Sequence, residues 1–295
     1  MPHGLMVVNA FLHTPKFDEI YQILLHSANA CGMELSVRTN AELCTVVDTP
    51  AFAPEKYDFV LFWDKDVELA TQLQQRGLPV FNSPESIRKC DNKALTYLAL
   101  KDKGFPMPRT ILAPKTFPAV GYTDTAFVDE AAGALGFPLV LKECFGSFGK
   151  QVYLLDDLET LRAKVLSLAG TPMLFQELAR ESYGRDIRIN VVGDRVVASI
   201  LRRSRNGDFR SNLTLGGSME RYEAGGEEAR LAVRAVRELG LTFAGVDVLF
   251  GKNGPLLCEV NSNAHFKTTL ECTGVNMAQE MFCQIGGLLK RGARA

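Results

Sequence analysis

Two apolar stretches near the C-terminal end of the chain carry acidic side chains in their middle. Residues 244–250 and 256–261 are rich in valine and leucine, and the segment GKNGP separates them. Glycine, asparagine and proline at such a place predict a tight turn, so the two stretches are expected to pair as a β-hairpin. A turn centred on Asn253 places Phe250 opposite Leu256. The chain must therefore build a sheet that contains this antiparallel pair.

Three oxygen-bearing side chains converge in this hairpin. The same register places Asp247 opposite Glu259, and Glu259 shares a face with Asn261 because the two are two residues apart. Carboxylates that face each other repel unless a cation lies between them, and oxygen ligands without His or Cys are typical of Mg²⁺. A solvated outer face of the hairpin is the alternative. Acidic groups among apolar neighbours favour the metal site, because their burial needs a compensating partner.

Residues 1–85 alternate between strand and helix patterns. Short apolar runs of strand length separate segments in which apolar residues recur at helical spacing. This alternation predicts a small open α/β sheet. No GxGxxG occurs, so a dinucleotide-binding fingerprint is absent. The expected strands are 4–11, 34–38, 57–63 and 79–81, and the expected helices are 17–30 and 67–76.

Two further segments follow. Ser83 and Pro84 are typical of a helix start, and this helix is expected to continue until Gly104 ends it. Beyond it, an α/β segment precedes a β-rich one with two hairpins. We expect domains at 1–85, 86–178 and 179–295, strands at 138–143, 151–155, 173–177, 186–192 and 195–202, and helices at 127–135, 158–168, 227–239 and 276–290.

Basic and glycine-rich features indicate where phosphate could bind. Lys142 ends an apolar strand and precedes the turn Gly146, Ser147, Phe148 and Gly149. Glycines let backbone amides approach phosphate oxygens, and the ammonium neutralises their charge. GxxxxGK[ST] is absent, so this is no Walker A loop, and a plain hairpin turn is the alternative. Further on, Arg202, Arg203, Arg205, Arg210 and Asn212 offer donors for a phosphoryl group or an oxyanion, or else form a basic surface loop.

Composition excludes several classes of protein. The 295 residues are 46% hydrophobic and 23% charged, and 33 basic against 34 acidic residues give a net charge of -1. This balance argues against a general nucleic-acid or membrane-surface binder. No run is long enough to span a bilayer, and no signal peptide is evident. The seven cysteines form no CxxC pair, which predicts free buried thiols in a cytosolic protein.

Ordered blocks of the sequence resemble the ATP-grasp superfamily, specifically the RimK-like amino-acid (α-L-glutamate) ligases. The blocks span roughly residues 80–265. GDFRSNL followed by EVN is specific for this branch, whereas the first 80 or so residues are only generically similar. The resemblance implies an α/β (α+β) ATP-grasp fold with an N-terminal pre-ATP-grasp domain. Its blocks are 91–93, 138–142 with the glycine turn, 176–177, 184–194, 207–213 with 216–217, Asp247, and 259–261.

The resemblance also implies a role for each matching residue. ATP and two Mg²⁺ ions are the expected cofactors, with Mn²⁺ as a substitute. Lys93 and Lys142 would hold the α- and β-phosphates under a lid formed by Gly146 to Gly149. Glu177 and Leu178 would face adenine, and Asp186 would bind the ribose. Contacts to the γ-phosphate and the acyl phosphate would come from Arg202, Arg210 and Asn212, and the ions would be held by Asp247, Glu259 and Asn261, with Glu259 bridging.

These parts imply a carboxylate–amine ligase. Transfer of the γ-phosphoryl group to a carboxylate makes an acyl phosphate, which an amine attacks to form an amide. An amino acid such as glutamate, added to a peptide, protein or small molecule, is the expected reaction, and a homo-oligomer stays open. A kinase of the same fold and a non-catalytic nucleotide-binding module are the alternatives. The intact set of metal-binding residues argues against the second.

Substrate specificity is expected at the carboxyl ends of strands, where ligands of open α/β sheets lie. The corresponding loops are 9–14, 64–66 and 263–267. In the last of these, the chain departs from the Ser-Pro-Gly-like segment of the family, which leaves the substrate open. His265 or Lys267, and Lys16 from the opposite side, are the candidates for pairing with a substrate carboxylate, and solvated loop residues are the alternative.

Overall fold

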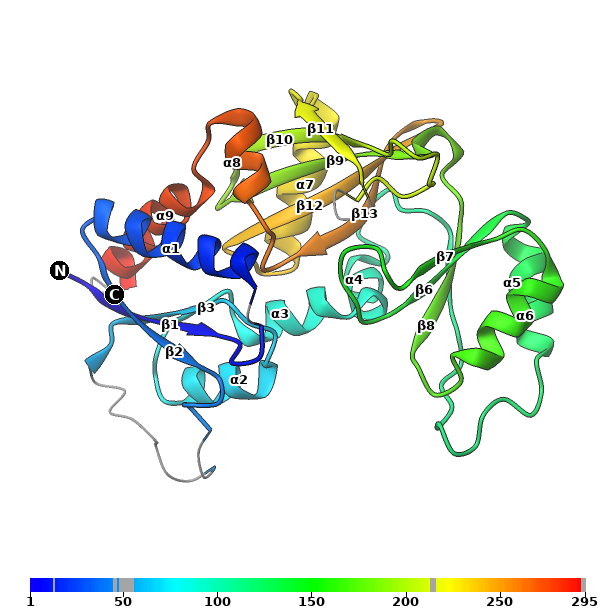
Figure 1. Ribbon diagram of the computed structural model, residues 1–295, viewed down its shortest axis with the longest axis horizontal. Helices are drawn as coiled ribbons and strands as arrows, with labels where there is room; N and C mark the ends of the chain where they lie inside the picture. The colour runs from blue at the N-terminus through cyan, green and yellow to red at the C-terminus, as the bar shows by residue number, and fades with distance from the viewer. Residues whose placement is uncertain (13, 45–46, 48–55, 213–215, 293–295) are drawn as a thin grey trace.

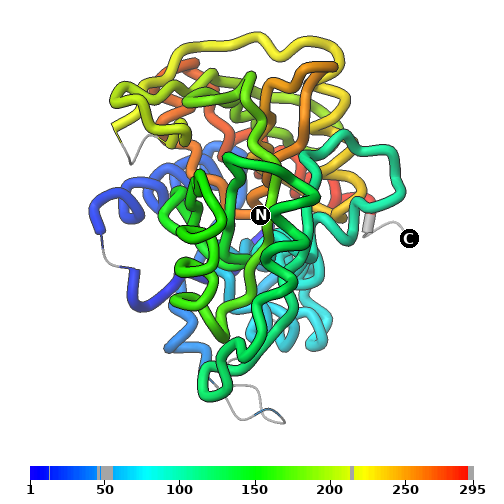
Figure 2. Tube along the Cα trace, turned by 90° about the vertical axis from the view of Figure 1, so that its right-hand side faces the viewer, coloured from blue at the N-terminus to red at the C-terminus, as the bar shows by residue number. Residues whose placement is uncertain are grey.

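The computed structural model describes residues 1–12, 14–44, 47, 56–212 and 216–292. It contains three sheets that follow one another along the chain (Figure 1). The central sheet lies at one end of the molecule, so the view of Figure 2 looks onto it with the other two behind. Leu213 of the GDFRSNL block lies outside the described residues. The mixed α/β content and the three sheets agree with the expected fold class.

The N-terminal sheet is parallel, with strand order β2-β1-β3-β4. Residues 5–8 of its central strand and all of the neighbouring strand 59–62 are apolar and buried, as expected where helices cover both faces of a sheet. Helix α1 packs on one face and α2 on the other. The predicted alternation is confirmed, with strands β1 (His3–Val8), β2 (Glu34–Thr39), β3 (Phe59–Phe62) and β4 (Val80–Phe81) and helices α1 (Pro15–Ala30) and α2 (Val67–Gln75).

The single helix expected from Ser83 to Gly104 is wrong. The structure has two helices there, α3 (Pro84–Asp91) and α4 (Lys93–Leu100). Asn92 between them is extended, with φ −106° and ψ 109°, and its Oδ1 accepts hydrogen bonds from the backbone of Ala94 and Leu95. Asparagine favours such capping over continuing a helix. The break sets Lys93 at the first position of a new helix.

The central sheet has the order β5-β8-β6-β7 and is antiparallel. Helices α5 and α6 cover its outer face (Figure 1). Leu139 and Leu141 of β6 pack against them, so the alternating Val140 and Lys142 face the opposite side. Strand β5, which follows two prolines, was not predicted. The elements are β5 (Thr110–Leu112), α5 (Ala126–Leu135), β6 (Leu139–Glu143), β7 (Val152–Leu155), α6 (Leu158–Ser167) and β8 (Met173–Glu177).

The C-terminal sheet is antiparallel, with order β11-β10-β9-β12-β13. Helix α7 packs on one face, together with residues of α3 and α4. Strand β11 and helix α8 were not predicted. The elements are the 3₁₀ turn η2 (Arg180–Ser182), β9 (Arg185–Val192), β10 (Arg195–Arg203), β11 (Ser218–Arg221), α7 (Gly226–Glu238), β12 (Phe243–Gly251), β13 (Gly254–Asn261), α8 (Lys267–Thr273) and α9 (Met277–Gly292).

The β12–β13 hairpin has a different turn from the one expected, yet the predicted carboxylate pair is correct. Phe250 pairs with Pro255 rather than with Leu256. A β-bulge then shifts the register between Asp247 and the residue after it, which restores the pairing of Asp247 with Glu259. The register change at the turn and the register change at the bulge therefore cancel at Asp247 and Glu259.

The N-terminal and C-terminal sheets share one core. Trp63, at the end of β3, stacks on Phe243 of β12 with ring centroids 6.1 Å apart. Fully buried Asn82 donates to the carbonyls of Phe243 and Ser262 at 2.9 and 3.0 Å, and it accepts from the Thr242 amide at 2.7 Å. Helix α9 packs on the N-terminal sheet beside α1. These contacts join the first expected domain (1–85) directly to the third (179–295), so the two pack as one unit on one side of the site.

All seven cysteines are free thiols. The expectation that they are buried is confirmed for Cys90 and Cys144 alone, since Cys31, Cys258 and Cys272 are half-buried and Cys44 and Cys283 are exposed. In the described part of the chain, no helix has both the length and the apolar character that a bilayer span requires.

Candidate active site

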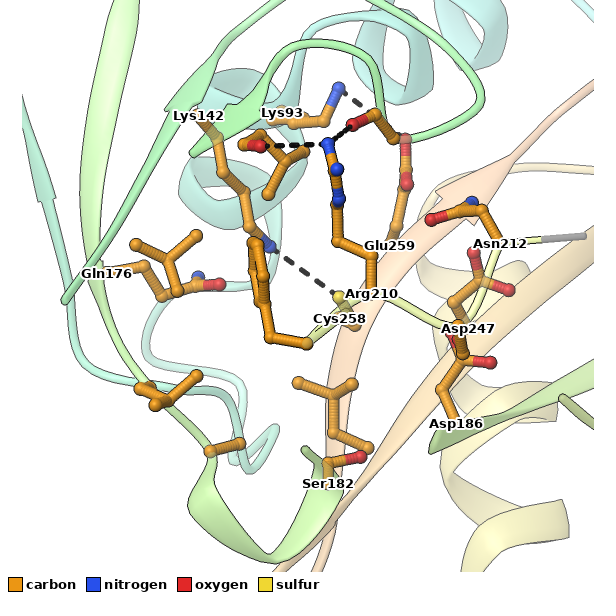
Figure 3. Close-up of a pocket in the computed structure, with 18 of the residues that line it drawn as sticks. Lys93, Lys142, Gln176, Ser182, Asp186, Arg210, Asn212, Asp247, Cys258 and Glu259 are labelled. Carbon is orange, nitrogen blue, oxygen red and sulfur yellow. Dashed lines mark hydrogen bonds and ion pairs between the residues drawn. The ribbon is translucent and has the colours of Figure 1, made fainter. Parts of the chain in front are cut away.

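A cleft with an empty volume of about 850 Å³ separates the central sheet from the C-terminal sheet. Strands β6 and β8 supply one wall, and β9, β10, β12 and β13 supply the other (Figure 3). This size and position are typical of small-molecule sites between packed segments. The predicted nucleotide residues lie on its walls, namely Lys93, Lys142, Gly146, Ser147, Phe148, Gly149, Glu177, Leu178, Asp186, Arg202, Arg210 and Asn212.

Two buried ammonium groups lie in the cleft. Lys142 is only 8% exposed, and its Nζ lies 3.6 Å from the Cys258 sulfur, with no carboxylate in an ion pair with it among the described residues. Lys93 is 7% exposed and lies 3.6 Å from a Glu259 oxygen and 3.4 Å from the Gly146 carbonyl. Burying a cation is costly unless an anion meets it. The cleft is therefore suited to an anionic ligand.

The carboxylate of Asp247 is buried between two arginines. Arg188 grips both of its oxygens, with 2.9 Å from Nη2 to Oδ2, and Arg202 Nη2 lies 2.9 Å from Oδ1. Burial alone would raise the pKa of Asp247, but the charges of Arg188 and Arg202 outweigh burial and lower it. The group is therefore an anion at neutral pH.

Arg202 links Asp247 to Asp186. Its Nε donates to Asp186 Oδ1 at 2.7 Å, and the side chain is buried. Burial disfavours the charged guanidinium, but Asp186 and Asp247 raise its pKa above the ordinary value. Asp186 and Arg202, which the resemblance assigns to the ribose and the γ-phosphate, bind each other in this structure.

Glu259 and Asn261 complete the predicted metal set. Glu259 faces Asp247 across the hairpin, and its side chain keeps 29% exposure. The Asn261 amide nitrogen lies 3.5 Å from the Gly245 carbonyl. The described residues contain no cluster of three or more His, Cys, Asp or Glu side chains that could hold a metal. Two carboxylates and one amide fit Mg²⁺ when other oxygens, such as those of phosphates, supply the rest of its shell.

The glycine loop is held down by contacts from the C-terminal segment. Arg210 Nη1 donates to the Gly149 carbonyl at 2.7 Å and to the Val152 carbonyl at 3.2 Å (Figure 3). Asp208 accepts hydrogen bonds from the other side-chain nitrogens of Arg210. Gly149 has φ +73°, and a Cβ there would lie 2.5 Å from the side chain of Asn212. Glycine is therefore required for the close approach. Arg210 fastens the loop rather than pointing into open space.

The far end of the cleft offers a flat apolar slot. Glu177 Oε1 accepts a hydrogen bond from the Arg109 amide at 2.8 Å, which fixes the hinge segment. Buried Gln176 donates to Tyr97 Oη at 2.7 Å and to Thr110 Oγ1 at 2.8 Å. The apolar side chains there are Val140, Leu249, Cys258 and Phe209. The sequence analysis gave none of them a role, because the first three have the pattern of ordinary sheet residues and Phe209 lies in a loop.

A second cavity, with an empty volume of about 1440 Å³, adjoins the first. It lies against the N-terminal segment, and Asn263 Nδ2 donates to the Asp64 carbonyl at 2.7 Å. Asn9 Nδ2 lies 3.2 Å from both carboxylate oxygens of Asp64, so residues of all three predicted loops lie close together, although, of their described residues, only those of the second and third loops line the cavity. Residue 13 of the first loop lies outside the described part of the chain.

The three predicted substrate residues all line this second cavity, but not as three free cations. Lys16 Nζ lies 4.3 Å from the ring centroid of Phe148, and burial lowers its pKa. Burial, helped by Lys16 and Arg188, lowers the pKa of His265 to about 4. The imidazole is therefore neutral at neutral pH in this structure, and the pairing of His265 with a substrate carboxylate stays a prediction. Lys267 pairs with Glu19 and Glu271.

Seven residues line both cavities, namely Gly146, Ser147 and Phe148 of the glycine turn together with Arg202, Asn212, Asp247 and Glu259. Arg188 also reaches this junction, and the sequence analysis did not assign it a role. It lies directly opposite Asp247 in the β9–β12 pairing. Knowledge of that pairing would have identified it, but no turn connects the two strands.

Comparisons with known proteins agree with this arrangement. A sequence model described as the RimK-like ATP-grasp domain matches residues 90–285. An uncharacterized Mycoplasma pneumoniae protein is 31% identical over 271 residues, which cover 90% of this chain and 92% of that one. Human N-acetylaspartylglutamate synthase A is 35% identical over 69% of this chain and 51% of its own length. A probable alpha-L-glutamate ligase from a Shewanella species is 36% identical, with 70% and 67% covered.

Solved structures share the fold at low identity. A RimK domain ATP-grasp protein from Sphaerobacter thermophilus superposes with a TM-score of 0.71, at 20% identity, over 96% of this chain and 99% of that one. D-alanine–D-alanine ligase from Bacillus anthracis gives 0.73 at 17% identity, over 100% and 99%. The ATP-grasp ligase PsnB, in a structure with Mg and ADP, gives 0.69 at 20% identity, over 96% and 97%.

The solved structures show the ATP-grasp fold, and the family model together with the relatives named as synthases and ligases defines an ATP-grasp ligase, a class of enzyme that forms carbon–nitrogen bonds with ATP and Mg²⁺. Within that class, the chain belongs to the RimK-like ATP-grasp family.

Proposed function

We propose that this enzyme joins the carboxylate of one substrate to the amino group of an amino acid through an acyl phosphate. The junction of the two cavities carries the proposal. Arg202, Asn212, Asp247 and Glu259 face both the cleft with the buried lysines and the cavity beside the N-terminal segment. A phosphoryl group could there pass directly from a nucleotide on one side to a carboxylate on the other.

The residues that line the cleft suit ATP bound in one orientation, with adenine at one end and the phosphates at the other. Adenine would lie in the apolar slot beside Glu177 and Leu178, and the phosphates would meet Lys93 and Lys142. The burial of these lysines supports the assignment, because phosphates would neutralise them. Asp186 would approach the ribose. Arg202, Arg210 and Asn212 would then lie near the γ-phosphate, where they would stabilise the charge of the transferring group.

The metal would lie at the Asp247–Glu259 pair. We propose two Mg²⁺ ions, replaceable by Mn²⁺, held by Asp247, Glu259 and Asn261, with Glu259 between them. Bound there, Mg²⁺ would offset negative charge on the phosphate oxygens. The arginines that grip Asp247 keep this carboxylate ionised and fix its direction, and Glu259 is the more accessible of the two acids.

The second cavity suits the acid and the amine. Glutamate is the amino acid we propose to test first, because the human and Shewanella relatives are named for glutamate or its conjugates. Lys16 would attract a substrate carboxylate, and neutral His265 would offer a hydrogen bond. Lys267 would contribute by exchanging its present partners. The chain spans about half the length of the human relatives it matches, so their acceptors do not carry over to it directly.

The decisive experiment measures both products of one reaction. The purified chain, with ATP and Mg²⁺, is offered a matrix of carboxylic acids and peptides against amino acids. Release of ADP is followed enzymatically, and mass spectrometry searches for the sum of acid and amine minus water. ADP together with that mass supports the proposal. A phosphorylated acceptor without amide would identify a kinase, and ATP binding without turnover would identify a regulatory module.

A further inference from the structure

Phe148, at the tip of the glycine loop, touches both of the other segments of the chain. The Lys16 ammonium, in the first turn of α1, lies 4.3 Å from its ring centroid. The His265 ring, in the loop after β13, lies at a centroid distance of 5.5 Å. An aromatic side chain of the central segment is thus gripped by residues of the N-terminal and C-terminal segments.

The position of the His265 ring is fixed by a further aromatic contact. The ring packs edge-on against Phe17 at 4.8 Å, and Phe17 follows Lys16 in α1. Both contacts to Phe148 therefore lead back to the same helix. Because burial lowers the pKa of His265 to about 4, this ring adds no positive charge beside Lys16 at neutral pH.

The backbone of Phe148 supports the same interpretation. Its φ is +60°, in the left-handed region that residues other than glycine rarely adopt, although glycines lie on either side of the Ser147–Phe148 pair. A bulky residue keeps this conformation only where its surroundings hold it. The contacts of the ring with Lys16 and His265 are such surroundings.

Phe148 also lies where a closure would matter, since it lines both cavities. Its neighbour Ser147 has its hydroxyl 3.5 Å from Lys65 Nζ, which adds a polar contact from the N-terminal segment. The loop that would cover the γ-phosphate is thus fastened on the substrate side by Phe148 and on the nucleotide side by Arg210.

We propose that Phe148 is an aromatic latch that keeps the glycine loop closed during catalysis and so excludes water from the acyl phosphate. This rests on the proposed function. In the productive reaction, the amine nitrogen forms a bond to the acyl carbon, the carbon–oxygen bond to phosphate breaks, and the amine loses a proton. If water attacks instead, the acid and phosphate are regained, and ATP has been converted to ADP without an amide.

The first test counts ADP released per amide formed. Wild type is expected near one, whereas Phe148→Ala should release about tenfold more ADP per amide, because an aromatic pair and a cation–π contact are lost. Phe148→Tyr keeps the ring and should restore coupling. Phe145→Ala is the matched control, since Phe145 belongs to the same turn, is 48% exposed and lines neither described cavity. Unchanged coupling in Phe148→Ala would overturn the proposal.

A second test reads the loop directly and needs no amide. Lys150, exposed at the end of the loop, gives trypsin a cleavage site, and cleavage there requires the loop backbone to leave its closed conformation. With Mg²⁺ and a non-hydrolysable ATP analogue bound, Phe148→Ala should be cut there about tenfold faster than wild type or Phe145→Ala. Lys16→Met, which removes only the cation, should show a smaller rise and serves if Phe148→Ala does not fold. Equal cleavage rates would refute the latch.

The two tests separate this proposal from the one on which it rests. If wild type makes no amide with any acceptor, the proposed reaction fails, and the cleavage rates still decide on the latch. If wild type makes amide and the variants are cut and coupled like wild type, the latch alone fails.

Discussion

The proposed nucleotide cleft and the proposed substrate cavity share seven lining residues, yet they are built from different kinds of element. Most charged groups in the cleft stand on strands, as Lys142, Asp186 and Arg202 do, and they are buried. The groups of the second cavity stand on helix starts and loops, as Lys16, His265 and Lys267 do, and they come from distant parts of the chain. Strands fix direction and spacing, whereas loops vary without disturbing the core. Under the proposed function, ATP chemistry would thus lie on the strands and substrate choice on the loops.

The largest effect is expected at the junction of the two cavities, where one substitution affects both of them. Glu259→Ala would remove the accessible carboxylate of the pair and should lower ADP formation by roughly a thousandfold, since oxyanion and metal contacts typically contribute that much. Initial rates with and without acceptor check this. The melting temperature should stay near that of wild type, because Glu259 is partly exposed. Turnover close to wild type would remove Glu259 from the metal site.

On the nucleotide side, Lys142→Ala should weaken ATP binding by about 10- to 100-fold, since charge-assisted hydrogen bonds contribute about 1.5–3 kcal/mol. Titration calorimetry measures the change, and the KM for the acceptor should stay nearly constant. Lys252→Ala, in the turn of the β12–β13 hairpin, is the control for a lost lysine. An unchanged ATP affinity would show that Lys142 is an ordinary strand residue.

The substrate side should respond to pH where the nucleotide side does not. The unfolded chain protonates His265 near pH 6.5, but the folded chain does so only at about 4. The contribution of this neutral imidazole to the free energy of unfolding is therefore fully present above pH 6.5. It is lost as pH drops toward 4, by up to about 2 kcal/mol between pH 7.5 and 5. Urea unfolding of wild type and His265→Phe at both pH values measures this. Equal pH dependence in the two proteins would contradict the buried neutral imidazole.

The same contrast explains what the sequence could predict. The pairing of Asp247 with Glu259 follows from alternation along a hairpin, and it survived an error in the turn because the bulge compensated. By contrast, the break at Asn92 depends on one capping side chain that overrode a helical pattern. Arg188 and Phe148 act through partners that are distant in sequence, and no local pattern contains such contacts. The partners of Lys267 likewise include Glu19, which only the packing of α1 brings near.

The smallest effect is expected at Lys267, and it tests the division between the two cavities most finely. Because Lys267 now pairs with Glu19 and Glu271, it must exchange these partners to meet a substrate, and such exposed pairs contribute little. Lys267→Ala should therefore raise the KM for the acid or the amine only about fivefold, a change of about 1 kcal/mol. The KM for ATP should stay unchanged within experimental error, since Lys267 lines the second cavity and not the first. Steady-state kinetics with each substrate varied in turn measures all three constants. A loss of ATP affinity, or no change in any constant, would move the substrate site away from the start of α8.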